Sequence, residues 1–227
     1  MPEFMPTGYI NIHTHSTESS KEVVAIINQD SKFESLSVNS YYSVGLHPWH
    51  LNSINTETEF QELKIAAELN NVRAIGECGL DKSCKTDFKL QEIQFRKQIH
   101  LANQLHKPLI IHCVRAFEEV ISALKEEQNN VSVIFHGFQK GAALAIRILE
   151  AGHYLSFGHQ LLSTKNEDVF KLVPWERLFL ESDNHPIPIE TIYQKAASIK
   201  GVSVNELANK ISNNFDRVFG PCKFESA

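Results

Sequence analysis

The sequence predicts an α/β protein built as a parallel barrel of βα units. From about residue 43 onward, short β-rich segments alternate with segments of helical periodicity, which is the pattern of parallel strands joined by helices. Each β-rich segment ends near a polar residue or a glycine. The chain has 227 residues, of which 42% are hydrophobic, so it can fill a sizeable core, and we expect one domain over residues 1–227.

The first strand is expected at Tyr9-Ile10-Asn11-Ile12-His13-Thr14-His15, a short apolar run that ends in two histidines. Successive side chains on a strand point to opposite faces, so His13 and His15 share a face at its carboxyl end. That arrangement suits a metal ion. Alone it is a weak signal, because two nearby histidines are more often ordinary polar residues than ligands.

The first third of the chain is less regular than the remainder. Residues 23–27 are rich in β-branched side chains and favour a strand, although Ser19 and Glu22 have the spacing of a capping box that opens a helix. The segment 16–40 is too short for two helical crossovers between parallel strands. We therefore expect an abbreviated first third with at least one outer helix missing.

The later elements can be placed from their periodicity and their end signals. Thr56-Glu57-Thr58-Glu59 resembles a capping box at the start of a helix, and Ser203-Val204-Asn205-Glu206 is a second one, for a helix that stops at Gly220-Pro221. Further helices are expected over 90–105, after Arg115, after Lys140, around Asp168 and after Ile189. Strands are expected at residues 43–47, 73–79, 109–114, 132–138, 154–158 and 178–183.

The composition excludes several classes of protein. A net charge of -5 and a pI near 6.1 leave no general basic surface, so contact with nucleic acid has to be local. No apolar stretch approaches a membrane span, and Met1-Pro2-Glu3-Phe4 lacks the features of a signal peptide. These features favour a cytoplasmic protein without a membrane partner.

The cysteines do not form a recognisable metal or disulfide motif. None has Cys-x-x-Cys spacing, and we expect structural thiols rather than disulfides at Cys78, Cys84, Cys113 and Cys222.

The expected strand ends carry an unusual concentration of metal-binding residue types. In a βα barrel the carboxyl ends of all strands converge on one face, which is the usual site of catalysis. Side chains far apart in the sequence are therefore expected around a single cavity: His13, His15, His47, Glu77, His112, His136 and Asp183. His153, His159 and His185 are expected to be solvated loop residues, with His185 at the rim.

The ordered set of motifs resembles the TatD family of metal-dependent hydrolases, in the amidohydrolase superfamily. That resemblance implies a distorted TIM (β/α) barrel, and it covers nearly the whole chain. The motifs are His13-x-His15, Val44-Gly45-Leu46-His47-Pro48, Gly76-Glu77-Cys78-Gly79-Leu80-Asp81, Ile111-His112, His136-Gly137-Phe138, Leu180-Glu181-Ser182-Asp183, Gln91-x-x-x-Phe95-x-x-Gln98-x-x-Leu101-Ala102 and Asn214-Phe215-x-Arg217-Val218-Phe219.

The resemblance implies a two-metal site. His13 and His15 would bind one ion together with Glu77 and Asp183, and Glu77 would bridge to a second ion held by His112 and His136. Such a pair lowers the pKa of a bridging water and stabilises the attacking and leaving oxygens of a phosphodiester. Asp183 is the best candidate for the general base, against a plain reading as a helix cap. Zinc, magnesium and manganese all suit parts of this ligand set.

Four residues are candidates for contact with a substrate. His47 matches the family's Gly-x-His-Pro signature, although hydrogen bonding that shapes its loop explains it nearly as well, and Trp49 offers a face for stacking on a base. Arg115 lies one position later than the family's usual arginine, because Val114 intervenes. Lys140 replaces part of the usual Cys-Phe-Ser-Gly segment and is a candidate phosphate contact.

These residues support three hypotheses of function. The leading one is a phosphodiester hydrolase, a TatD-like deoxyribonuclease that binds DNA transiently and has no obligate protein partner. The second keeps the metals and hydrolyses a small amide or ester. The third is a metal-binding interaction protein without catalysis.

Overall fold

The computed structural model describes residues 8–17, 20–30, 33 and 36–221. Eight strands form a sheet in chain order from β1 to β8, and the pairings between them are parallel. The chain divides into two compact units, residues 1–27 with 136–227 and residues 28–135. Each unit has its own run of strands, its own helices and its own core. Residues 1–4, Ser19 and Cys222 lie outside the described residues.

The first unit joins the two ends of the chain. Its strands are β1 (Tyr9–Thr14), the start of β2 (Val23–Gln29), β7 (Tyr154–Phe157) and β8 (Leu178–Leu180). β1 pairs with β2, β7 pairs with β8, and a bridge from Thr14 to Asp183 connects β1 to the segment after β8. Its helices are α4 (Ala142–Glu150), α5 (Glu167–Leu172), α6 (Ile189–Lys200) and α7 (Val204–Phe219).

Apolar packing and one buried hydroxyl hold the first unit together. α6 and α7 both pack on β1 and β8, and fully buried aromatic rings fill the space between the helices and the strands. Burial of each such ring contributes roughly 1.5–3 kcal/mol. Tyr193 on α6 reaches β1, where its hydroxyl accepts from the Ile10 N–H (3.1 Å) and donates to the Ile10 carbonyl (3.0 Å). β1 is thereby fixed in the segment that leads to the two histidines.

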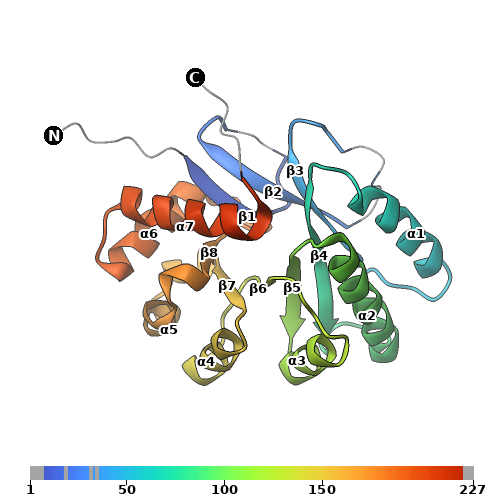
Figure 1. Ribbon diagram of the computed structural model, residues 1–227. Helices are drawn as coiled ribbons and strands as arrows, with labels where there is room; N and C mark the ends of the chain where they lie inside the picture. The colour runs from blue at the N-terminus through green and yellow to red at the C-terminus, as the bar shows by residue number, and fades with distance from the viewer. Residues whose placement is uncertain (1–7, 18–19, 31–32, 34–35, 222–227) are drawn as a thin grey trace. The chain divides into compact units, whose positions relative to one another are not determined.

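The second unit is an uninterrupted βα run. Its strands are β3 (Tyr41–Val44), β4 (Val72–Asp81), β5 (Leu109–Val114) and β6 (Val133–Phe135). Three helices pack on it, α1 (Thr56–Ala67), α2 (Phe88–Leu105) and α3 (Phe117–Glu126). Figure 1 shows α2 lying beside β4 in the green part of the ribbon.

The expected irregular first third is confirmed. β2 is a strand, as its β-branched residues predict. In the described residues between β1 and β2 (15–17 and 20–22), and between β2 and β3 (30, 33 and 36–40), there is no α-helix, so the first helical crossover is the one that contains α1. In these described ranges, therefore, outer helices are missing.

Three expected strands end three residues early, for identifiable reasons, whereas β4 runs two residues beyond its expected end, to Asp81. β3 ends at Val44 because the backbone of Leu46 bonds to a helix side chain, Gln98, and not to a neighbouring strand. β6 ends at Phe135, and Gly137 then turns into the left-handed region with φ 56°. β8 ends at Leu180, before Asp183, which also has a left-handed backbone, with φ 53°.

The two expected capping boxes have different outcomes. Ser203 caps α7 as expected, because its hydroxyl accepts from the Glu206 N–H at 3.1 Å. At α1 the expectation was wrong: the N-cap is Asn55, and Thr56 is the first helical residue. The Thr56 hydroxyl donates to the carbonyl of Asn52 instead and so stabilises the turn that precedes the helix.

Cys78, Cys84 and Cys113 form no disulfide among the described residues; Cys78 is buried, and the other two are half-buried. Burial raises the pKa of the Cys78 thiol, which suits a structural residue. Among the described residues, no helix has the length and apolar character needed to cross a membrane.

We predict that Gly79 is irreplaceable in β4. It has φ 140°, and a Cβ atom there would lie 2.0 Å from the carbonyl oxygen of His112 on β5. Gly79→Ala should lower the free energy of unfolding by roughly 3 kcal/mol, from backbone strain plus steric overlap. Gly201→Ala is the control, because Gly201 also has positive φ (68°) but open space around it, and it should cost about 1 kcal/mol. Urea unfolding measures both, and equal losses would contradict the close approach of β4 to β5.

Candidate metal centre

The carboxyl end of β1 brings two histidines to one aspartate in the first unit. The Nε2 atoms of His13 and His15 lie 3.5 and 3.6 Å from Oδ1 of Asp183. His13 is fully buried, whereas the side chains of His15 and Asp183 are each about one-third exposed. Ligand atoms of all three lie within 4.8 Å of one another, which is close enough for one ion. Two imidazoles and a carboxylate are a suitable partial ligand set for zinc or manganese.

Polar side chains beneath these ligands fix the junction between β1 and the segment after β8. The amide of Asn11 donates to Ser182 Oγ (2.8 Å), and its oxygen accepts from the Ser182 N–H (3.0 Å). Ser182 in turn donates to the hydroxyl of Thr14 (3.0 Å). The Asp183 N–H donates to the His13 carbonyl, and the His15 N–H donates to the Asp183 carbonyl. Asp183 is thus held between the two histidines in spite of its left-handed backbone.

His136 joins the same group from the end of β6. Its ring lies 4.4 Å from the ring of His13, measured between centroids. Its Nδ1 atom is 3.3 Å from Oε1 of Glu181, and that same oxygen accepts from the Gly137 N–H at 2.7 Å. Because Glu181 engages Nδ1, the Nε2 atom of His136 is the ring nitrogen left for a metal ion. We call His13, His15, His136, Glu181 and Asp183 the first cluster.

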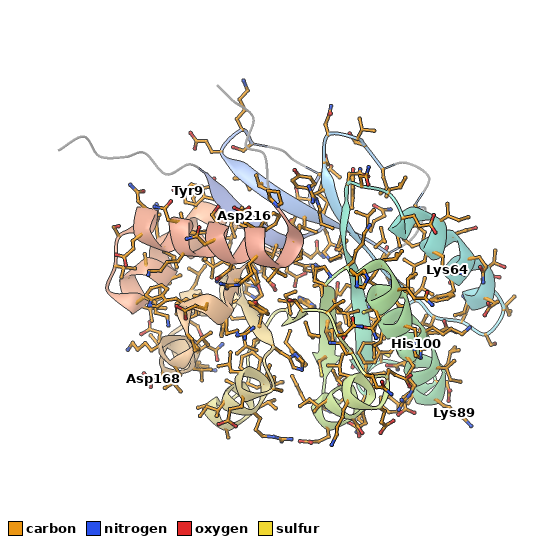
Figure 2. The ribbon with its side chains drawn as sticks, in the orientation of Figure 1. Tyr9, Lys64, Lys89, His100, Asp168 and Asp216 are labelled. Atoms are coloured by element: carbon orange, nitrogen blue, oxygen red, sulfur yellow. The ribbon has the colours of Figure 1, made fainter. Side chains whose placement is uncertain are left out.

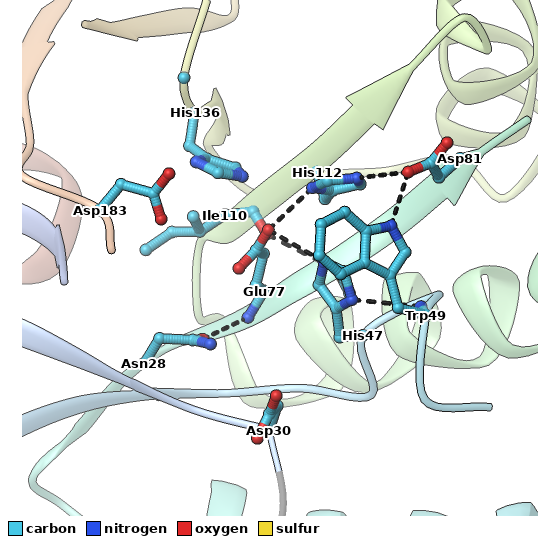
Figure 3. A network of polar contacts seen from close by, with 12 residues as sticks. Asn28, Asp30, His47, Trp49, Glu77, Asp81, Ile110, His112, His136 and Asp183 are labelled. Atoms are coloured by element: carbon cyan, nitrogen blue, oxygen red, sulfur yellow. Dashed lines mark hydrogen bonds and ion pairs between the residues drawn. The ribbon is translucent and has the colours of Figure 1, made fainter. Parts of the chain in front are cut away.

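The second unit contains a separate group around Glu77 (Figure 3). Oε1 of Glu77 lies 3.1 Å from Nε2 of His47 and 2.8 Å from Nδ1 of His112. Its backbone N–H donates to Oδ1 of Asn28 at 2.7 Å, which fixes the end of β4 against the end of β2. We call His47, Trp49, Glu77, Asp81 and His112 the second cluster.

The hydrogen bonds assign the tautomer of His47. Its Nδ1 accepts from the Trp49 backbone N–H at 3.2 Å, so Nδ1 carries no proton. The proton therefore resides on Nε2 and is donated to Glu77. Burial lowers the pKa of His47, although the hydrogen bond to Glu77 opposes that shift, and the ring is neutral near pH 7. His47 holds a carboxylate in place without adding a charge.

Asp81 orients the other imidazole of this cluster. Its Oδ2 lies 3.1 Å from Nε2 of His112 and accepts from the indole N–H of Trp49 at 2.6 Å. Burial by itself raises the pKa of Asp81, but the hydrogen bonds from Trp49, Ser83 and His112 outweigh it and leave the pKa below its ordinary value. An ionised Asp81 that accepts from Nε2 leaves Nδ1 of His112, on the Glu77 side, for a metal ion.

Two buried glutamines on α2 position the loops that carry these groups. Gln91 accepts from the Asp81 N–H (2.8 Å) and donates to the Asp81 carbonyl (3.1 Å). Gln98 makes the same pair of bonds to Leu46, next to His47 (2.7 and 3.2 Å). The glutamines of the α2 motif therefore act on the site through backbone geometry.

The donor chemistry of both clusters fits divalent metal ions. The remaining oxygen of Glu181, Oε2, is buried and lacks a hydrogen-bond donor among the described residues. An unsatisfied buried carboxylate oxygen is costly, and a cation removes that cost. Two compact sets of ligand atoms support this conclusion: His13, His15 and Asp183 form one, and His47, Glu77 and His112 form the other.

The structure distributes the expected site residues unevenly. His13, His15, His136 and Asp183 meet in the first unit, and His47, Trp49, Glu77 and His112 meet in the second. Among the described residues, Arg115 and Lys140 hydrogen-bond to neither cluster. Arg115 is exposed and has a left-handed backbone with φ 55°, and Lys140 is exposed before α4.

Two histidines expected to be solvated are half-buried. Burial next to Arg177 lowers the pKa of His153 to about 4, so this ring is a neutral packing residue. His159 stacks on His185 with 4.1 Å between ring centroids, and only His185 is exposed.

The sequence did not reveal the roles of Asp81 and Glu181. Both belong to motifs that were recognised, Gly76 to Asp81 and Leu180 to Asp183, but no role was assigned to them. The available signal was the presence of a second carboxylate in a motif that already supplied a ligand. A metal-binding histidine usually donates its other ring nitrogen to such a group.

A parallel barrel whose strand ends carry clusters of histidine and carboxylate is the architecture of a metal-dependent hydrolase. The chain belongs to the family described as TatD related DNase, whose model matches residues 6–220. It is accordingly a metal-dependent hydrolase of that family, as the sequence motifs indicate.

Relatives and solved structures agree with this assignment. The uncharacterized metal-dependent hydrolase YabD of Bacillus subtilis (strain 168) is 32% identical over 198 residues, 79% of this chain and 77% of the relative. The 3'-5' ssDNA/RNA exonuclease TatD of Erwinia amylovora is 26% identical over 237 residues, 94% and 88% of the two chains. The crystal structure of YJJV, a TatD homologue from Escherichia coli K12, matches with a TM-score of 0.80 at 21% identity over 94% of this chain and 98% of that one, which confirms the distorted barrel fold.

We predict that Asp81 and Glu181 set metal affinity without being required for folding. Asp81→Asn and Glu181→Gln should each weaken the binding of Zn²⁺ or Mn²⁺ about tenfold, because each leaves a ligand histidine in a poorly fixed tautomer. Asp168→Asn is the control, since Asp168 projects from α5 (Figure 2) with a side chain that is 98% exposed. Competition against a fluorescent chelator measures the affinities. Unchanged affinity in both variants, with folding intact by circular dichroism, would refute their positioning role.

Proposed function

We propose that this chain is a divalent-metal-dependent phosphodiesterase that cleaves single-stranded nucleic acid. The observation that carries the proposal is the pairing of each histidine–carboxylate cluster with a buried acid that orients an imidazole, Glu181 in the first and Asp81 in the second. Membership of a family described as TatD related DNase supports the choice of phosphodiester, as does the exonuclease name of the Erwinia amylovora relative.

The proposal includes two divalent ions. His13, His15 and Asp183 would hold one ion, His112 and His136 would hold the other, and Glu77 would be a ligand of both. When bound, such a pair supplies an activated water and neutralises charge that develops on the scissile phosphate. The neutral His47 keeps Glu77 in its ligand orientation by donating from Nε2, and the buried surroundings of Glu77 strengthen its attraction to a cation.

Asp183 is proposed as the general base. Its carboxylate lies near both His13 and His15, and its side chain is 31% exposed, so one part of the carboxylate faces the histidines and another faces solvent. A group in that position can accept the proton of the attacking water and later release it. Its backbone bonds to His13 and His15 keep the carboxylate in place during the transfer.

We predict that cleavage requires Asp183. Purified protein with Mn²⁺, Mg²⁺ or Zn²⁺ should cleave a single-stranded oligonucleotide, and Asp183→Asn should lower kcat at least about 100-fold, through loss of the base and of one proposed metal ligand. Prior removal of metal with a chelator should abolish cleavage, and re-addition should restore it. Residual cleavage in Asp183→Asn equal to the wild type would indicate a contaminating nuclease.

A substrate panel separates this proposal from amide or ester hydrolysis. The same preparations should be assayed on simple phosphodiesters, on amides and on carboxylic esters. Turnover confined to the carbonyl compounds would overturn the phosphodiesterase proposal while leaving the metal-dependent hydrolase intact.

Trp49 is proposed as a stacking platform for a base. The residue is 57% exposed, its ring lies at 86° to the ring of His47 and at 79° to the ring of His112, and its indole N–H donates to Asp81. An exposed ring held by its own edge loses little freedom when a base covers its face, which favours stacking.

We predict that two Trp49 variants separate stacking from the bond to Asp81. Trp49→Phe keeps an aromatic face and loses the N–H, so KM for an oligonucleotide should change less than threefold or so, whereas Trp49→Ala should raise KM about tenfold. A simple phosphodiester without a base should show no such difference. If both variants raise KM equally, Trp49 acts only through Asp81.

A further inference from the structure

The first unit contains a cavity beside the first cluster that the proposed chemistry does not use. Its volume is about 560 Å³, within the range of pockets that bind small ligands or nucleotides. It lies between the loop that leads into α4 and the short 3-10 turns η2 (His159–Leu162) and η3 (Thr164–Asn166). All of its lining residues belong to this unit.

The lining of this cavity is cationic. Lys140 and Lys165 both face it, and no carboxylate is among the residues that line it. Neither lysine has an acidic partner in the part of the chain that the structure describes, whereas the nearby acids of α5 do have cations: Glu167 lies 2.5 Å from Lys195, and Asp168 lies 3.7 Å from Lys171. In a chain with a net charge of -5, this is a local reversal of charge.

The cavity adjoins the first cluster through its polar wall. Gln160 lines it, is buried, and accepts from the Gly158 N–H at 2.9 Å. On its other side Gln160 approaches Gly137, whose N–H bonds to Glu181. His159 also lines the cavity and stacks on His185, two residues after Asp183. A ligand in the cavity therefore lies next to the groups proposed to hold the scissile phosphate.

We propose that this cavity binds a flanking phosphate of a nucleic acid strand, with Lys140 and Lys165 as its cationic contacts. The proposal rests on the phosphodiesterase function and narrows it: the substrate is an oligonucleotide with more than one phosphate, not an isolated diester. Two unpaired lysines suit a phosphate because each contributes a mobile point charge, and polar amides at the wall accommodate sugar and bridging oxygens.

The test compares Lys140→Gln/Lys165→Gln with a control that changes the charge equally. Lys89→Gln/Lys125→Gln serves this purpose, since both lysines are exposed on helices of the second unit, and Lys89 projects away from α2 in Figure 2. The cavity variant should raise KM for a single-stranded oligonucleotide about tenfold and flatten the dependence of log KM on log salt by roughly 1 to 1.5, as expected for two lost phosphate contacts. Its kcat/KM on a simple phosphodiester should equal that of the wild type. The control variant should match the wild type in its oligonucleotide KM, in the salt dependence of that KM and in its kcat/KM on the simple phosphodiester.

The substrate provides a second, independent change. Replacing one flanking linkage by an uncharged methylphosphonate, on the 5' side or on the 3' side of the cleaved bond, should raise KM about tenfold at one of the two positions in the wild-type protein. At that position the cavity variant should show no further loss. Equal sensitivity of wild type and cavity variant to every methylphosphonate would overturn the proposal.

Failure of the two proposals can be told apart. If the simple phosphodiester is cleaved while the cavity variant leaves oligonucleotide KM and its salt dependence unchanged, the subsite is refuted and the phosphodiesterase stands. If no phosphodiester is cleaved, the subsite is tested by binding instead, with fluorescence anisotropy of a labelled single-stranded oligonucleotide and metal-loaded protein. Binding that weakens about tenfold only in the cavity variant supports the subsite without the reaction, and binding equal in both variants refutes it.

Discussion

The requirement that buried carboxylates be hydrogen-bonded organises both clusters. Glu77, Asp81 and Glu181 are each less than 5% exposed, and an uncompensated charge at such a depth costs several kcal/mol. Asp81 meets the requirement with three donors, and Glu77 accepts from Nε2 of His47 while Nδ1 of His112 lies 2.8 Å from the same oxygen. Glu181 satisfies one oxygen and leaves Oε2 without a donor among the described residues. The acids thus fix the histidines, and the unsatisfied oxygen marks where positive charge is still needed.

The sequence predicted the order of strands and helices and the residue types at the strand ends, because both follow from periodicity that every βα unit repeats. The sequence alone predicted that His13, His15 and Asp183 lie close together, because the carboxyl ends of parallel strands lie on one face of the barrel. The hydrogen-bond partner of each histidine's second ring nitrogen follows no such periodic pattern. Its partner is Asp81 for His112 and Glu181 for His136, on a neighbouring strand in one case and two strands along in the other. Spacing along the chain does not contain that information.

The residues at which the strands end also could not be predicted from the sequence. A run of β-rich residues shows where extended backbone is favourable, but a strand stops where its backbone finds another partner. Leu46 bonds to Gln98 on α2, and Ser182 bonds to the side chain of Asn11. Both exchanges occur one residue from a group of a cluster, so the irregular backbone that defeats the prediction is also what aims His47 and Asp183. The wrong strand ends and the candidate site coincide here because the hydrogen bonds that end each strand also position the neighbouring cluster residue.

Two departures from the family's motifs concern cationic residues, Arg115 and Lys140. The usual arginine after the β5 histidine is displaced to Arg115, which is exposed with a left-handed backbone. In the loop after His136, a lysine appears instead, and Lys140 lines a cationic cavity with Lys165. In the proposed phosphate subsite, the cationic charge therefore lies in the loop before α4, in the unit that contains His13, His15 and Asp183. An acidic chain repels a polyanion at long range, so the proposed binding of a strand rests on such local placement of lysines and not on net charge.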